Sequence, residues 1–460
     1  MGFDYQSLAS GQFQMPDGWK LTTIEEVAEV NEKAITPKNA PAHIRYIDIA
    51  SVDKGKILDI QELSFKAAPS RARRVVRDKD SLISTVRPNL EHYLFVKEPE
   101  PNTIASTGFA VVSAKAVDPR FLYYYMTSKP FTAYLTQIAE SHTSAYPAFN
   151  PDVIEQAELI LPKDDEQRAI AHILGSLDDK IEMNRRMNQT LEAMARAIFK
   201  SWFVDFDPVV YNAVQAGNPV PERFAQTAAR YRNGAPCPVP DDIARLFPNS
   251  FRDSELGEIP KGWEVKSLDQ IANYLNGLAC QKYPPKKGED SLPVIKIREL
   301  RQGISENTDI ATSNVPACYI VRDGDVLFSW SGSLIIDIWT QGKGVLNQHL
   351  FKVTSDTYPK WFYYYWTEFH LIEFQRVAAY KATTMGHIKR QNLTDAKCTV
   401  SNNELMKIVD EKMSSLLTLR INNELEIRNL AVLRDTLLPK LISGELRIPD
   451  AEKFVEEAGV

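Results

Sequence analysis

Two stretches of the chain carry apolar residues at alternating steps of three and four, a spacing typical of a long helix that buries one face. The first stretch starts at Asp164, where Asp164 and Gln167 have the spacing of a capping box, and neither Pro nor Gly interrupts it after Gly175. About forty residues at this rise give a helix of roughly 60 Å. Its predicted stripe consists of Ile170, Leu174, Leu177, Ile181, Asn184, Asn188, Leu191, Ala195, Ile198 and Trp202.

The second stretch starts at the capping-box sequence Ser401–Glu404, and Pro439 and Gly444 mark its end. Lys412 and Glu426 interrupt its stripe. As in the first stretch, Asn lies in the middle. The predicted stripe consists of Leu405, Val409, Leu416, Leu419, Asn423, Leu430, Leu433 and Leu437.

A helix with so long an apolar face is not stable alone in water. We therefore expect the two helices to pack on each other, antiparallel, as an intramolecular coiled coil in which the Asn residues fix the register. The alternative is that each helix packs on its own neighbouring domain.

The chain also contains one pattern twice. Five motifs recur in the same order at an offset that drifts by only a few residues, which indicates a duplicated domain rather than a solenoid. The matched pairs are Met15–Leu21 with Ile259–Val265, Ile47–Ile49 with Ile295–Ile297, Asp80–Ser84 with Asp325–Ser329, Pro119–Tyr125 with Pro359–Tyr365, and Thr143–Ser144 with Thr383–Thr384.

Each copy has a mixed α and β pattern. Ser81–Val86 and Asp325–Trp330 are typical of buried strands, and the triple-tyrosine stretches at Tyr123 and Tyr363 are typical of helices. These aromatics either form the domain core, which we favour, or stack on bases. The predicted fold is α/β (mixed α+β), with two homologous globular domains separated by two long antiparallel helices that form a coiled-coil spacer.

The predicted organisation places a Pro-rich connector between the two halves. Residues 208–258 hold seven prolines and little periodicity, so we expect them to be partly ordered at most, with a helical turn or two at Asp242–Phe247. The segments are 1–160 (first domain), 161–207 (first long helix), 208–258 (connector), 259–400 (second domain), 401–446 (second long helix) and 447–460 (tail).

Composition narrows the class of protein. The net charge of −6 argues mildly against nucleic-acid binding unless basic residues are locally concentrated. Four cysteines are scattered without CxxC spacing, which excludes the common zinc patterns and a disulfide framework. The chain shows neither a membrane span nor a secretory signal, so we expect it in the cytoplasm.

Catalytic motifs are missing from the sequence. It has no GxxxxGK[ST] phosphate loop, no GxGxxG, no HExxH and no Asn-Pro-Pro-Tyr or Asn-Pro-Pro-Phe loop of an adenine methyltransferase. We therefore predict no catalytic residue and no metal site, and a binding protein rather than an enzyme.

The strongest candidate for nucleic-acid contact is Ser64–Lys79, which holds six basic residues and one acidic residue. Its composition favours a loop whose Lys and Arg side chains neutralise phosphates, the alternative being a solvated surface loop. Arg, Asn and Lys elsewhere can read base edges, and the sequence leaves open which residues contact bases and which contact phosphates. The DNA-binding candidates are Lys66, Arg71, Arg73, Arg74, Arg77, Arg87, Asn89, His142, Thr143, Ser144 and Tyr146 in the first copy, and Lys282, Lys286, Lys287, Lys381, Thr383, Thr384, His387, Lys389 and Arg390 in the second.

Together these features resemble the specificity (S) subunit of type I restriction–modification systems. The likeness covers nearly the whole chain, and the combination of passages is specific, whereas single pieces are not. The passages that carry it are Ala105–Val111, Leu161–Ile181, Ala197–Phe206, Glu255–Trp263 and Leu437–Leu446.

The resemblance implies a role in phage defence. Each copy would be a target recognition domain for one half of a bipartite, asymmetric double-stranded DNA site. The helix pair would space the domains and dock two methyltransferase (M) subunits, which methylate adenine with S-adenosylmethionine, while restriction/translocase (R) subunits use ATP and Mg²⁺. No cofactor would bind this chain itself.

The second copy departs from the first in the residues that carry the resemblance. Met385–His387 replaces Tyr146–Ala148, and Val345–His349 replaces the Ser-Thr-Gly-Phe stretch. The second half-site therefore has no predictable sequence. Two other functions stay open: a coiled-coil DNA-binding scaffold without sequence discrimination, and a stand-alone DNA-modifying enzyme.

Overall fold

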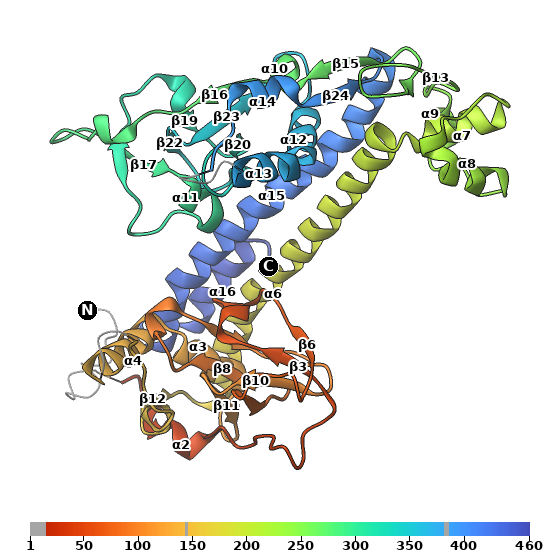
Figure 1. Ribbon diagram of the computed structural model, residues 1–460. Coiled ribbons are helices and arrows are strands. Elements are labelled where there is room, and N and C mark those ends of the chain that lie inside the picture. The colour runs from red at the N-terminus through yellow and green to blue at the C-terminus, as the bar shows by residue number, and fades with distance from the viewer. Residues whose placement is uncertain (1–14, 143–145, 381–385) are drawn as a thin grey trace. The chain divides into compact units, whose positions relative to one another are not determined.

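The computed structural model describes residues 15–142, 146–380 and 386–460. The chain divides into two compact units, shown in Figure 1. Unit 1 consists of residues 1–182 and 429–460, and unit 2 of residues 183–428. Unit 1 therefore combines the beginning of the first long helix with the end of the second.

The domain of unit 1 is built on two four-stranded sheets. Their strand orders are β2-β11-β8-β9 and β6-β3-β10-β7, and β1 pairs with β12 beside them. Only β3 and β10 among these named pairs run parallel. The elements are β1 (Lys20–Thr23), α2 (Ile24–Val27), β2 (Ala28–Val30), β3 (His43–Ile47), η1 (Ile49–Ser51), β4 (Val52–Asp53), β5 (Lys56–Ile57), β6 (Gln61–Ser64), β7 (Ala72–Val75), β8 (Ser81–Ser84), η2 (Pro88–Leu90), β9 (Tyr93–Phe95), β10 (Thr103–Ser106), β11 (Phe109–Ala114), α3 (Pro119–Met126), α4 (Lys129–His142), α5 (Asp152–Glu155) and β12 (Glu158–Leu161).

The domain of unit 2 repeats this topology. Its sheets have the orders β16-β23-β20-β21 and β18-β17-β22-β19, β15 pairs with β24, and β17 and β22 run parallel. The predicted duplication is thus confirmed strand by strand. The elements are β15 (Glu264–Ser267), α10 (Leu268–Ile271), β16 (Asn273–Asn276), η5 (Cys280–Lys282), β17 (Ser291–Ile295), α11 (Ile297–Gln302), β18 (Ile310–Thr312), η6 (Ala317–Tyr319), β19 (Ile320–Val321), β20 (Val326–Ser329), β21 (Ile336–Ile338), β22 (Gly344–Leu346), β23 (Leu350–Thr354), α12 (Lys360–Phe369), α13 (Leu371–Tyr380), α14 (Arg390–Asp395) and β24 (Lys397–Val400).

The predicted strands and tyrosine helices form the cores of both domains. All four residues of β8 and all four of β20 are buried. Tyr125 and Tyr365 are at most 2% exposed and lie in helices α3 and α12. The tyrosines are therefore core residues, and stacking on bases is excluded for them.

The two long helices are α6 (Asp164–Phe199), which continues through the π-helical turn η3 (Lys200–Val204), and α15 (Asn403–Ile442). They lie side by side in each unit (Figure 1). In unit 1 Arg434 donates to Asp178 at 2.6 Å, and in unit 2 Asn423 donates to Asn188 at 2.9 Å. The partner on α15 moves back along the chain as α6 advances, so the predicted antiparallel pairing is confirmed.

The stripe predicted on α6 is confirmed, since its members are buried except the half-buried Ile198. On α15 the prediction is wrong at Leu419, whose side chain is 43% exposed. Met413 and Leu417 are buried in its place. Successive steps of four from Leu405 turn the buried face gradually around the helix, because four residues exceed one turn of 3.6. This face belongs to the core of the second domain, so part of α15 packs on its own domain.

Neither predicted capping box forms as expected. At the start of α6, Gln167 accepts the Asp118 N–H, and the Lys163 N–H bonds to Glu166 instead. At the start of α15, the side chain of Asn402 caps the helix by accepting the Leu405 N–H. Both helices thus use a neighbour of the predicted capping residue.

Pro439 lies inside α15 rather than at its end. The Ser443 N–H still bonds to the Pro439 carbonyl, so the last turn continues. The helix stops where Gly444 adopts a φ of +72°, a left-handed conformation that glycine takes without strain.

The prediction that residues 208–258 are partly ordered at most is wrong. They form most of α7 (Asp207–Gln215), then η4 (Glu222–Phe224), α8 (Ala225–Arg232), α9 (Asp241–Ala244) and β13 (Phe251–Arg252), which pairs with β14 (Ile259–Pro260) just beyond the range. Pro208 lies in the first turn of α7, and Pro240 precedes α9. These positions suit proline, because the missing N–H would have no intrahelical partner there. Apolar residues such as Val209 and Tyr231 join the core of unit 2.

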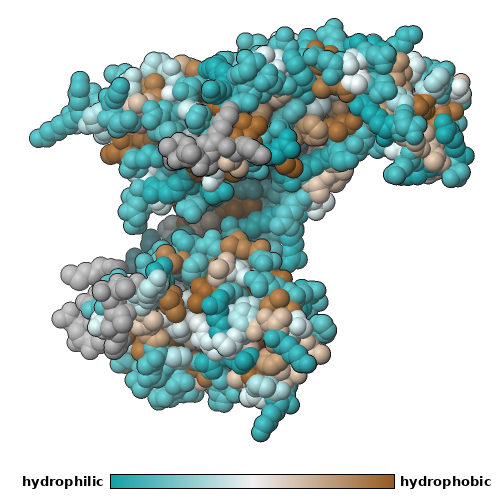
Figure 2. Space-filling model, in the orientation of Figure 1, coloured by the Kyte–Doolittle hydropathy of each residue, from teal (hydrophilic) through white to brown (hydrophobic). Residues whose placement is uncertain are grey.

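The segment called a tail is also ordered. Residues Ile448–Glu457 form α16, in which Ala451 and Val455 are buried. Among the described residues, no helix is both long enough and apolar enough to cross a bilayer. Figure 2 shows a face on which hydrophilic residues predominate.

The buried Asn layer gives a stability prediction. Replacing Asn188 with Leu leaves the Asn423 amide, 5% exposed, without its acceptor. We expect the free energy of unfolding to fall by about 1–3 kcal/mol, which is measured as a lower midpoint of thermal unfolding. The double variant N188L/N423L should recover most of it, because both polar partners are then gone. Asn422→Leu, at an exposed position of the same helix, is the control. Equal losses in the single and double variants would contradict the paired layer.

Candidate nucleic-acid interface

The basic stretch of the first domain is only partly a loop. Ala72–Val75 forms strand β7, which lies at the edge of its sheet beside β10. The expectation of a loop over Ser64–Lys79 is therefore wrong in its central part. Side chains of a strand alternate between its two faces, so Arg73 and Arg74 point to opposite faces of the strand.

Several arginines of this stretch already have partners. Arg71 bonds to Tyr46 and Asp48, which raises its pKa, and Arg77 pairs with Glu32 at 2.6 Å. Burial lowers the pKa of Arg74. The carboxylates of Asp48 and Glu32 therefore offset part of the positive charge that the sequence suggested.

The lysines of the stretch are the better phosphate candidates. Lys66 and Lys79 are exposed, and neither makes an ion pair within the described part of the chain. Arg73 is half-buried, with its guanidinium 5.1 Å from the centre of the Phe65 ring.

A set of backbone hydrogen bonds joins three segments of the first domain. The segments follow β8, follow β10 and precede α5. The Thr85 N–H donates to the Gly108 carbonyl at 2.9 Å, the Phe149 N–H to the Thr85 carbonyl at 3.1 Å, and the Arg87 N–H to the Pro147 carbonyl at 2.8 Å. These contacts hold the three segments together at one place on the domain.

The second domain has the same bonds at the corresponding residues. The Trp330 N–H donates to the His349 carbonyl at 3.4 Å and the Ile388 N–H to the Trp330 carbonyl at 3.0 Å. The Gly332 N–H donates to the Gly386 carbonyl at 2.8 Å. We call this arrangement the shared frame; it comprises residues 85–87, 108 and 147–149 in the first domain and 330–332, 349 and 386–388 in the second.

The shared frame of the first domain brings predicted residues together. The Arg87 guanidinium lies 4.8 Å from the centre of the Tyr146 ring, and Tyr146 is 70% exposed. Asn89 is exposed in the adjacent short helix η2. His142 is the last residue of α4. Two other candidates, Thr143 and Ser144, lie outside the described residues.

The shared frame of the second domain carries rings instead. The centre of the Trp330 ring lies 5.9 Å from that of His349 and 6.4 Å from that of His387. Trp330 donates from Nε1 to Asn276 at 2.9 Å, and the Ser331 hydroxyl contacts His349 Nδ1 at 2.9 Å. The candidates Lys381, Thr383 and Thr384 lie outside the described residues.

Sequence reasoning named His387 but missed Trp330, His349 and Asn276. Trp330 was assigned to a buried strand, although β20 ends at Ser329 and the indole is only half-buried. Alignment of the two copies could have found Trp330 and His349, because it pairs Trp330 with Thr85 and His349 with Gly108. Different side chains at equivalent backbone positions indicate that the two surfaces bind different ligands.

The remaining basic candidates of the second domain fall elsewhere. Lys282, Lys286 and Lys287 are exposed in a segment whose Tyr283 carbonyl accepts the Thr312 N–H, next to edge strand β18. Lys389 is exposed just before α14.

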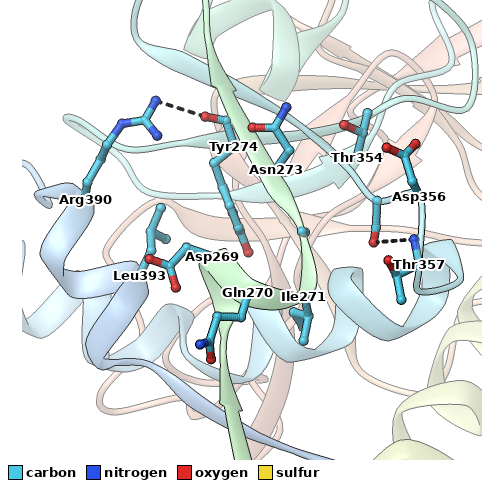
Figure 3. Close-up of a pocket in the computed structure, with 12 residues that line it drawn as sticks. Asp269, Gln270, Ile271, Asn273, Tyr274, Thr354, Asp356, Thr357, Arg390 and Leu393 are labelled. Carbon is cyan, nitrogen blue, oxygen red and sulfur yellow. Dashed lines mark hydrogen bonds between the residues drawn. The ribbon is translucent and has the colours of Figure 1, made fainter.

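Arg390 has a structural contact. Its guanidinium lies 5.8 Å from the centre of the Phe351 ring. It also donates to the Tyr274 carbonyl at 3.2 Å, a bond drawn as a dashed line in Figure 3. It lines an open pocket of about 350 Å³ together with Asp269 and Asp356. Burial alone would raise the pKa of Asp269, but hydrogen bonds from Ser267 and Thr394 outweigh it and the pKa is lowered. An ionised carboxylate at this pocket disfavours phosphate.

A tyrosine fixes the first domain on the helix pair of unit 1. The Tyr124 hydroxyl donates to Asp178 of α6 at 2.7 Å, and the same carboxylate accepts from Arg434 of α15. Arg120 of α3 pairs with Asp179 of α6 at 2.6 Å. Helix α6 therefore contacts α3 directly, and α15 joins the contact through the Asp178 carboxylate that Tyr124 and Arg434 share.

The homologous residue Tyr364 contacts a long helix in unit 2. Arg420 of α15 donates to the Tyr364 hydroxyl at 3.2 Å and to Asp337 of β21 at 2.8 Å. Arg196 of α6 pairs with Glu368 of α12 at 2.7 Å. The partners differ from those in unit 1, but the tyrosine position is kept.

Metal binding has no support in the described part of the chain, where no group of three or more His, Cys, Asp or Glu side chains is placed to hold an ion.

Comparison with known proteins gives a consistent result. Residues 16–193 and 260–426 match the family described as the type I restriction modification DNA specificity domain. The chain is 27% identical over 441 residues to the type I restriction enzyme HindI specificity subunit of Haemophilus influenzae, covering 89% of this chain and 95% of that protein. It is 23% identical to the MjaIX specificity subunit of Methanocaldococcus jannaschii, covering 95% of each.

A solved structure shares the fold. It is the S subunit of a type I restriction–modification system from M. genitalium, with a TM-score of 0.50 and 12% sequence identity. The match covers 94% of this chain and 98% of that chain.

The unpaired lysines give a prediction on salt dependence. The double variant K66A/K79A should weaken binding to duplex DNA and reduce the slope of log K against log salt by about 2, since each phosphate contact contributes about 0.9. Binding is measured by fluorescence anisotropy over a series of salt concentrations. Arg45→Ala is the control, because Glu62 and Glu100 already pair with Arg45. A slope that stays unchanged in the double variant would rule out phosphate contacts at both lysines.

Proposed function

The chain belongs to the type I restriction–modification DNA specificity family, and from this premise we propose that each of its two domains reads one half of a bipartite, asymmetric DNA site. The observation that carries this proposal is the shared frame. An equal backbone arrangement bears Arg87 and Tyr146 in one domain and Trp330, His349 and His387 in the other. Unlike donors and rings favour unlike base sequences, so the two half-sites differ.

The helix pair serves as the spacer between the half-site readers. Buried amides fix its register, since Asn184 donates to Glu426 and Asn188 to Glu424, each at 2.9 Å. A one-turn slip would break these bonds and leave polar groups buried without partners. A fixed register supports a fixed number of base pairs between the half-sites.

The same helices dock two methyltransferase subunits. Met183, Met187 and Met194 of α6 are 39–53% exposed and, by their spacing, share one face of the helix. Exposed methionines adapt to varied partner surfaces. Partner subunits would also supply positive charge that a chain of net charge −6 lacks.

Catalysis belongs to the partners. Specificity subunits of type I systems are non-catalytic. In this proposal the methyltransferase subunits hold S-adenosylmethionine and methylate adenine, and restriction/translocase subunits hold ATP and Mg²⁺. The chain itself binds DNA and partner proteins and no cofactor.

A domain exchange tests the proposal. Replacing residues 15–158 with those of another family member should change one half of the methylated site and leave the other half and the spacing unchanged. Sequencing of methylated DNA from cells with the complete system reads the outcome. Exchanging residues 259–400 instead should change only the opposite half. A site that survives both exchanges would favour the scaffold without sequence discrimination.

A further inference from the structure

Arg87 holds an uncommon backbone conformation. Its φ is +49°, in the left-handed region that residues other than glycine rarely adopt. The Arg87 N–H bonds to the Pro147 carbonyl at 2.8 Å, and the Arg87 carbonyl accepts the Leu90 N–H at 2.9 Å. Such strain persists only where surrounding contacts impose it, and it is frequent at binding sites. The frame therefore projects this side chain from a fixed position.

The guanidinium of Arg87 is also oriented. It lies over the Tyr146 ring, 4.8 Å from its centre, and both residues are exposed. A ring under one face of the guanidinium restricts its plane and leaves its edge open.

Arg87 differs in its partners from two arginines of the basic stretch. Arg71 pairs with Asp48 and Arg77 with Glu32. Within residues 15–142, 146–380 and 386–460, Arg87 has no carboxylate partner. Its fork of donors is thus oriented and available to a ligand.

The chemistry of a fixed, planar donor fork matches one base edge. Guanine presents O6 and N7 side by side in the major groove, and a bidentate arginine is the commonest specific contact to it. A phosphate also binds arginine, but it accepts a lysine and needs no fixed plane. We propose that Arg87 reads a guanine in the half-site of the first domain and that Tyr146 positions its guanidinium; this inference rests on the proposed function.

The second domain lacks this reader. Gly332 takes the place of Arg87 in the shared frame, where its N–H donates to the Gly386 carbonyl. Trp330 and His349 occupy the frame instead. The guanine requirement is therefore confined to one half of the site.

The test compares variants in the assembled methyltransferase complex, using duplexes that carry the methylated site of the wild-type complex or single substitutions in it. The half read by the first domain is assigned by the exchange of residues 15–158. Arg87→Gly suits the left-handed backbone and copies the second domain, so folding should be kept. It should lose roughly 5- to 150-fold of discrimination at one G·C pair, the range of one bidentate contact.

Conservative variants separate base reading from charge. Arg87→Lys keeps the charge without the fork and should lose the same discrimination. Tyr146→Phe should discriminate like the wild type, and Tyr146→Ala should lose part of the discrimination at the G·C pair. Lys66→Ala should weaken all duplexes equally. Unchanged thermal unfolding and assembly with methyltransferase subunits confirm that each variant folds.

Two results would overturn the inference. One is a half-site of the first domain that contains no guanine. The other is an Arg87→Lys variant that discriminates like the wild type while Arg87→Gly weakens every duplex equally, which identifies a phosphate contact. A wild-type complex whose methylated site is not bipartite would refute the proposed function instead, so the two failures are distinguishable.

Discussion

The hydrogen bonds of the shared frame join main-chain groups that every non-proline residue carries. Thr85 and Trp330 differ in every property of their side chains, yet each donates and accepts through its backbone at the same two places. The frame therefore tolerates exchange of the side chains that it presents. Tyr124 and Tyr364 extend this constraint to the long helices, since each ties its domain to them within its own unit. Position is conserved between the copies while the binding surface is free to change.

Periodicity was sufficient to predict the two long helices and their antiparallel pairing, because a continuous apolar stripe must be buried. It failed at Leu419, where the neighbouring domain rather than the partner helix decides which face is covered. The connector was misjudged because proline was counted without regard to position. Pro208 and Pro240 stand at helix starts, where they favour order instead of preventing it.

The candidate site was predictable only in part. Arg87 and Tyr146 were found because cations and exposed aromatics beside turns are visible in a sequence. The pairing of Arg71 with Asp48 was not, since the carboxylate follows β3, far away in the sequence, and only the fold brings it near. Trp330 and His349 gave no local signal either; they become candidates once the two backbones are seen to be equal.

Unit 1 is assembled from segments on both sides of unit 2 in the chain. During synthesis on the ribosome, residues 183–428 emerge as one continuous piece and have all their own contacts available. The pairing of residues 164–182 with α15, shown by the bond from Arg434 to Asp178, forms only after residues 429–442 follow. The half made first is thus completed last, and its long helix lacks α15 as a partner for the whole time needed to translate the other half.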